Sequence, residues 1–182
     1  MNISGVRPNV TFYYGKAKST VMQFSEDLRY LNGRLGDLPI IADLSISAQR
    51  QEPISKQIES VVVVLRKYRD SLGEVYEDFT HMLKIAQEAI ISLEDDIENP
   101  PLGIEEDRIN SLIVTRRKAE EYETSLQGYT NAVENQFQLA KNSVAAFEKS
   151  RTKPSMIALD SVIRVLITKD AEIRQVIGGI AS

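Results

Sequence analysis

The sequence predicts a mainly all-α protein built on a long antiparallel coiled-coil hairpin, with N- and C-terminal helices packed on it as a three- or four-helix bundle. Three observations predict this fold. Apolar residues recur in steps of three and four through two long segments, 54–97 and 104–147, which is the period of coiled coils. A helix-breaking segment, residues 99–103, separates them. Each terminus adds a shorter amphipathic stretch that needs a partner face.

The N-terminal arm and short helix, residues 1–50, begin with a β-prone run, Val10 to Tyr14, between Pro8 and Gly15. Aromatic and β-branched residues in such a run predict a strand, and segment 39–48 is its candidate partner in a small β ribbon. A short amphipathic helix is predicted after the run. Its apolar positions fall in steps of three and four: Val21, Phe24, Leu28, Leu31 and Leu35.

The hairpin occupies the segment 51–153. Pro53 suits a first helical turn, and each helix presents one apolar seam toward the other. The seam of the first helix is Ile54, Ile58, Val61, Leu65, Tyr68, Leu72, Val75, Phe79, Met82, Ala86, Ile90, Leu93 and Ile97. The seam of the second is Ile109, Ile113, Arg116, Ala119, Tyr122, Leu126, Tyr129, Val133, Phe137, Ala140, Val144 and Phe147. A short turn makes the two helices antiparallel neighbours.

The register of the hairpin follows from the position of the turn. A turn centred on the two prolines pairs Leu65 with Phe137 and Leu72 with Tyr129. It also places Gly73 and Gly128 at one level. These glycines mark either a crossing point, where another helix comes close, or two independent positions that tolerate glycine.

The C-terminal segment, residues 154–182, is predicted to be an apolar helix with a break near residues 168–170, where Asp170 falls in the seam. Its apolar residues cover more than one face, so the hairpin alone leaves part of them uncovered. Self-association through both termini is therefore predicted, and the competing account is that both termini fold back on the hairpin. The predicted partner-binding residues are Val10, Phe12, Tyr13, Tyr14, Val162, Leu166, Ile173, Ile177 and Ile180.

Composition excludes several kinds of chemistry. The chain of 182 residues has no cysteine and one histidine, His81, so it has no disulfide, no thiol catalysis and no Cys-ligated zinc. A single histidine also argues against a Ser-His-Asp triad or a histidine metal site within one chain. We therefore predict no catalytic residue, no cofactor and no metal. The pI of about 5.2 argues against a nucleic-acid partner.

Two charged clusters have alternative interpretations. Seven carboxylates flank the predicted turn between Glu94 and Asp107. They form either a docking tip for a basic partner, a weak Ca²⁺ site without EF-hand spacing, or a tip kept in solution by its charge. Arg116-Arg117-Lys118 is the one basic cluster, and no aromatic residues surround it as they do in sites that bind single-stranded nucleic acid.

The opening Ile3-Ser4-Gly5-Val6-Arg7-Pro8, with Phe12-Tyr13-Tyr14 after it, resembles the start of small uncharacterised helical proteins of clostridial bacteria. This resemblance implies no activity. In its helical design without Cys or Trp, the chain also resembles axial proteins of flagella and type III secretion systems, which are exported without a cleaved signal.

The sequence thus predicts a non-enzymatic structural or assembly subunit of a bacterial appendage, secretion apparatus or phage particle. Its partner would be a second copy or another protein of the assembly. The alternative is a cytosolic helical adaptor or export chaperone that binds a partner helix; a helical-bundle enzyme is the third hypothesis. We expect no membrane span and a soluble chain, exported without a cleaved signal peptide or part of a particle.

Overall fold

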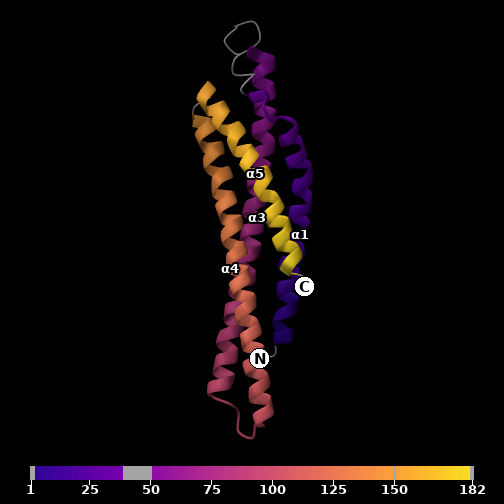
Figure 1. Cartoon of the computed structure of the whole chain (residues 1–182), viewed down its shortest axis with the longest axis vertical. Helices are drawn as coiled ribbons and strands as arrows, with labels where there is room; N and C mark the ends of the chain where they lie inside the picture. The colour runs from indigo at the N-terminus through magenta and orange to yellow at the C-terminus, as the bar shows by residue number, and fades with distance from the viewer. Residues whose placement is uncertain (1–2, 39–50, 150, 181–182) are drawn as a thin grey trace.

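The computed structural model describes residues 3–38, 51–149 and 151–180 of the chain. Four long helices account for most of these residues: α1 (Ile3–Gly33), α3 (Gln51–Glu98), α4 (Glu106–Lys149) and α5 (Lys153–Ile180). Each helix runs antiparallel to the one before it, and the described residues contain no strand (Figure 1). The predicted all-α hairpin with terminal helices packed on it is confirmed.

The α3–α4 hairpin is the backbone of the molecule. Its helices have 48 and 44 residues, which corresponds to about 65–70 Å at the α-helical rise. The turn contains Gly103, whose φ of 87° favours glycine. Helix α1 packs along α3, while α5 packs on α4 and makes a smaller contact with α1. The part with four helices therefore lies at the end opposite the turn, and the turn end projects as a two-helix hairpin (Figure 1).

The predicted strand Val10 to Tyr14 is wrong, because these residues lie within the continuous helix α1. Val10, Tyr13 and Tyr14 are partly buried against the core, and the Tyr13 ring stacks on His81 of α3 with centroids 4.8 Å apart. Burial of a helical face against α3 thus outweighs the local β propensity, which depends strongly on context. The predicted partner strand, 39–48, lies outside the described residues.

The predicted break near residues 168–170 is also wrong, since α5 is one helix from Lys153 to Ile180. Asp170 does fall among buried positions, but Arg174 one turn later donates a 2.6 Å hydrogen bond from Nε to its carboxylate. The Thr168 hydroxyl donates to the carbonyl of Arg164 rather than capping a new helix. An ion pair within one helix therefore accommodates the polar residue without a break.

The register of the hairpin differs from the predicted one. A Cβ built on Gly73 lies 3.2 Å from Cε2 of Phe137, so Phe137 packs about two turns beyond its predicted partner, Leu65. One reason is that α4 begins at Glu106 rather than residue 104. The other is that side chains on both helices lean toward their own N-termini, which displaces contacting residues in opposite directions in an antiparallel pair.

The core runs through the four-helix part of the molecule. All four helices contribute to it, and its largest fully buried side chains include Phe24, Leu31, Leu65, Tyr68, Leu72, Phe79, Met82, Leu126, Phe147, Ile163 and Leu166. By contrast, α4 contains no buried residue before Leu126. Among the described helices, none has a stretch apolar enough to span a membrane.

Candidate interaction surfaces

A polar layer crosses the core and holds α5 in place. Gln136 of α4 donates from Nε2 to the hydroxyl of Tyr68 on α3 (2.6 Å) and to the carbonyl of Leu166 on α5 (3.2 Å). Arg174 of α5 donates to the carbonyl of Val21 on α1 (3.3 Å). Burial raises the pKa of Tyr68 well above its ordinary value of 10. The phenol stays neutral, and the layer is a structural element that sets the position of α5 relative to the other three helices.

Two buried carboxylates fix α1 on α3. Lys16 donates from Nζ to Asp78 at 3.2 Å, and Lys67 donates to Asp27 at 3.0 Å. Both carboxylates are almost completely buried, whereas both ammonium groups lie near the surface. The hydrogen bond from Lys16 to Asp78 raises the pKa of Lys16 above 10.5. In one pair the lysine belongs to α1, and in the other it belongs to α3. Together the two pairs define the register of α1 along α3.

The end of α1 is capped by α5. The backbone N–H of Gly36 donates to Asp160 at 2.7 Å, and Arg164 holds the other oxygen of that carboxylate at 3.1 Å. Gly36 has a φ of 84°, a conformation that favours glycine. The cap joins residues far apart in the sequence, and it belongs to the fold rather than to a reactive site.

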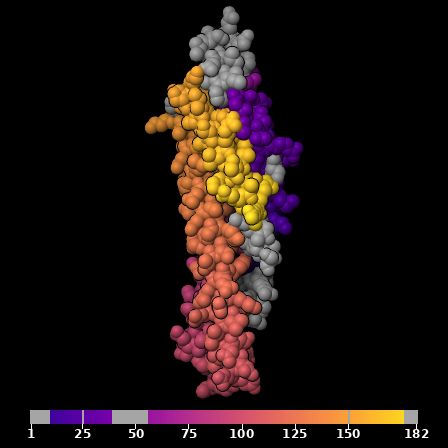
Figure 2. All heavy atoms as spheres, in the orientation of Figure 1, coloured from indigo at the N-terminus to yellow at the C-terminus, as the bar shows by residue number. Residues whose placement is uncertain are grey.

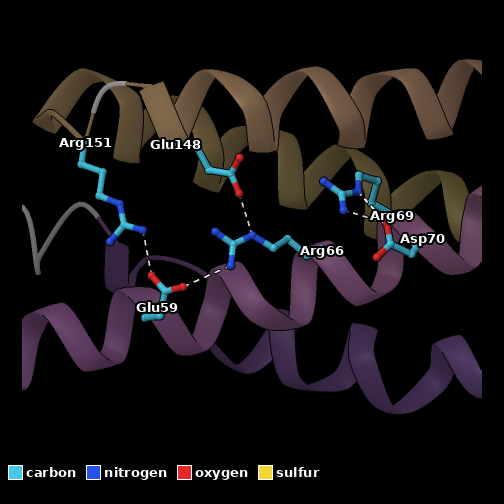
Figure 3. A network of polar contacts seen from close by, with 6 residues as sticks. All are labelled: Glu59, Arg66, Arg69, Asp70, Glu148 and Arg151. Carbon is cyan, nitrogen blue, oxygen red and sulfur yellow. Dashed lines mark hydrogen bonds and ion pairs between the residues drawn. The ribbon is translucent and has the colours of Figure 1, made fainter.

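A surface network joins α3 and α4 to Arg151, which lies just before α5 (Figure 3). Arg66 donates to Glu148 at 2.6 Å and to Glu59 at 3.2 Å, and Arg151 donates to Glu59 at 2.7 Å. The hydrogen bond from Arg151 lowers the pKa of Glu59 below its ordinary 4.5. Glu59 and Glu148 are therefore already neutralised by arginines of the same chain.

Most of the predicted partner-binding residues lie inside the bundle. Leu166 and Ile173 are buried, and Val10, Tyr13, Tyr14 and Val162 are packed against the core. Phe12 is the exception, with 66% of its surface exposed, whereas the side chains of Ile177 and Ile180 lie outside the described residues. The termini fold back on the hairpin, so the buried residues of this set offer no accessible surface. Their apolar faces are used by the chain's own core.

The hairpin tip carries exposed apolar side chains that the seam pattern did not predict as a surface. Ile91 is 65% exposed, and Leu102, Ile113 and Val114 are also exposed. The available signal was that Ile91 and Val114 lie off the predicted seams and that Leu102 lies in the predicted turn. Exposed apolar side chains surrounded by polar residues are typical of protein interaction sites.

A groove lies between α4 and α5, with a volume of about 600 Å³. Its α4 wall includes small residues at helical spacing, Ser125, Gly128 and Ala132, and α5 contributes Val165 and Ile173. A Cβ on Gly128 would meet nothing within 4 Å, so the two glycines do not form one crossing point. Figure 2 shows α5 covering only the upper part of this face of the molecule.

The remaining candidate residues make ordinary surface contacts. Arg116 and Arg117 form ion pairs one turn along α4 with Glu120 and Glu121. His81 is exposed at the α1–α3 contact. Within the described part of the chain, no three His, Cys, Asp or Glu side chains lie together as a metal site would require.

No protein-family model, curated protein or solved structure matches this chain.

Proposed function

We propose that this chain is a non-enzymatic structural subunit that joins a protein assembly through its hairpin tip. A bacterial appendage, a secretion apparatus and a phage particle are the kinds of assembly that suit a rod of this shape. The observation that carries the proposal is the set of exposed apolar side chains at the tip: Leu102 in the turn, and Ile91, Ile113 and Val114 on the two helices that lead to it. A projecting hairpin with exposed apolar side chains gives a partner two adjacent helices to pack against.

Burial of the exposed apolar side chains at the tip would release enough free energy for association. Full burial of an Ile, Val or Leu side chain contributes roughly 1.5–3 kcal/mol, so three or four such residues give several kcal/mol at the tip. Lost rotational and translational freedom opposes much of this gain. Each subunit contact is therefore weak on its own, as suits a subunit that assembles reversibly at its working concentration.

The test is light scattering over a series of protein concentrations. The unmodified chain should gain average mass as its concentration rises, and a tip variant, Ile91→Gln with Val114→Gln, should remain monomeric. The matched control is Met22→Gln, since Met22 is equally exposed on the bundle surface; this variant should assemble like the unmodified chain. A chain that is monomeric at every concentration, or a tip variant that still assembles, would contradict the proposal.

The groove between α4 and α5 favours a second function, that of an adaptor or export chaperone for a partner helix. Small side chains on α4 allow a fifth helix to approach closely beside Gly128 and Ala132. Binding of labelled synthetic amphipathic helices, followed by fluorescence anisotropy, tests this function. Filling the groove with Gly128→Leu should abolish binding, whereas Ser161→Leu on the exposed face of α5 should leave it intact. Equal binding by both variants would exclude the groove.

A further inference from the structure

The two ends of the rod differ strongly in charge. At the tip, residues 88–108 carry eight carboxylates and one cation. At the opposite end, the described residues 26–38, 56–67, 141–149 and 151–164 carry ten lysines and arginines against six carboxylates. The long hairpin separates these two groups by most of its length (Figure 1). The molecule is therefore an electrically polar rod with an acidic tip and a basic bundle end.

The bundle end has the features that would complement the tip. Its carboxylates Glu59 and Glu148 are paired with arginines of the same chain, and Arg29, Lys141 and Lys149 are exposed. Val63 and Ile157 are exposed at the same end. Apolar side chains among cations thus face outward at one end, and apolar side chains among carboxylates face outward at the other.

We infer that the occupant of the tip is the bundle end of a second copy, so that subunits join head to tail. This inference rests on the proposed function, because it names the partner of the same tip. Opposite charges at the two surfaces steer their encounter and fix which ends meet. Contact between two tips would bring two strongly negative surfaces together. A head-to-tail contact uses two different patches, and it therefore builds open chains or rings rather than closed dimers.

Charge reversal at each end tests the inference in the full-length protein. The tip variant combines Glu94→Lys, Asp95→Lys, Asp96→Lys and Glu98→Lys, which leaves four carboxylates against five cations. The end variant combines Arg29→Glu, Lys141→Glu and Lys149→Glu, which leaves seven cations against nine carboxylates. Lysines near the C-terminus of α3 suit the helix dipole, and circular dichroism verifies that both variants keep their helix content. Sedimentation velocity at low ionic strength should show association weakened about tenfold or more in each variant. Association of the unmodified chain should also weaken as salt screens the charges.

Mixing the two variants gives the decisive result. In the mixture, the positive tip of the tip variant can bind the negative bundle end of the end variant. The unaltered bundle end of the tip variant can likewise bind the unaltered tip of the end variant. The mixture should therefore assemble, although neither variant does so alone. If the end variant assembles like the unmodified chain while the tip variant does not, the tip binds elsewhere: the head-to-tail inference is overturned and the proposed function survives. If the unmodified chain never associates, both are wrong.

Discussion

In the four-helix part of the molecule, the seam of α3 is closed on more than one side, and Leu65, Leu72 and Phe79 are completely buried. Toward the tip, the same helix continues with the same period, but α1 begins near its residue 91, and α4 is the only described helix that faces the rest. Leu93 remains buried there, whereas Ile90 and Ile97 are only partly covered. A heptad pattern therefore predicts which face of a helix is apolar, while the number of neighbouring helices decides how much of that face is removed from water.

The same comparison separates two roles for polar residues. In the bundle, Asp27, Asp78 and Asp170 are buried and paired with cations of α1, α3 or α5. At the tip, carboxylates such as Glu98 and Glu105 are exposed. Buried ion pairs restrict how helices align, and exposed like charges keep a surface in solution or direct it toward a partner of opposite charge.

Truncation of an apolar residue should give the largest difference in stability loss between the bundle and the tip. Phe24→Ala removes a fully buried ring of the bundle and should lower the free energy of unfolding by about 3–5 kcal/mol. Ile113→Ala at the tip, where the side chain is largely exposed, should cost less than about 1 kcal/mol. Urea unfolding followed by circular dichroism measures both values. Equal losses would show that the tip is packed as tightly as the bundle.

Removal of a cation should give the next largest difference in stability loss, between a lysine paired with a buried carboxylate and a lysine in an exposed pair. Lys16→Met leaves the Asp78 carboxylate buried without its hydrogen-bond donor and should cost about 1–3 kcal/mol. Lys84→Met breaks only an exposed pair with Glu88, and it should change stability by less than about 1 kcal/mol. Thermal unfolding of the two variants provides the comparison.

The pH dependence of the Lys16 pair is a further part of that measurement. The pKa of Lys16 is raised above 10.5 in the folded state. The ion pair with Asp78 therefore contributes fully to folding stability below pH 10.5, and this contribution is lost as the pH rises through the raised pKa. The unmodified chain should therefore lose stability between about pH 10 and 12 more steeply than Lys16→Met does. Parallel curves for the two proteins would contradict the assignment of this pair.

Substitution of the two glycines in the hairpin helices should change stability by less, and the two changes should differ in sign. Gly128→Ala places a methyl group in open space on the groove wall and should stabilise the protein by up to about 1 kcal/mol through helix propensity. In Gly73→Ala the new methyl group lies 3.2 Å from the Phe137 ring, so displacement of that ring should cancel or reverse the gain. Unfolding free energies of both variants are the measurement, and an equal gain at both positions would mean that the α3–α4 contact is loose.

The hairpin and its seam could be predicted from the sequence because they depend only on local period and on one turn. Residues such as Tyr68 and Met82 lie where the period puts them. The pairing of Phe137 could not be predicted from the period, since any two seams of this type match at several offsets. It depends on the length of the turn and on the direction in which side chains lean along the helix axis.

The interaction surfaces were less predictable, because they depend on which faces other helices cover. Leu166 and Ile173 are as apolar as a docking site requires, yet they are buried by contacts that only the tertiary fold creates. Ile91 and Val114 became candidates only because the folded chain leaves their side chains exposed. Likewise, the helical conformation of Val10 to Tyr14 follows from packing on α3 rather than from its own β propensity.

Hydrogen–deuterium exchange of the full-length chain, measured as a function of concentration, tests the central claim most directly. In dilute solution, amides of residues 92–112 should exchange faster than those of 58–86, because the two-helix tip opens more readily than the four-helix bundle. At high concentration the tip amides and those of the bundle end around Lys149 and Lys153 should become slower, while the core around Leu65 and Phe79 stays unchanged. A tip that is as protected as the core when dilute, or unaffected by concentration, would contradict the account.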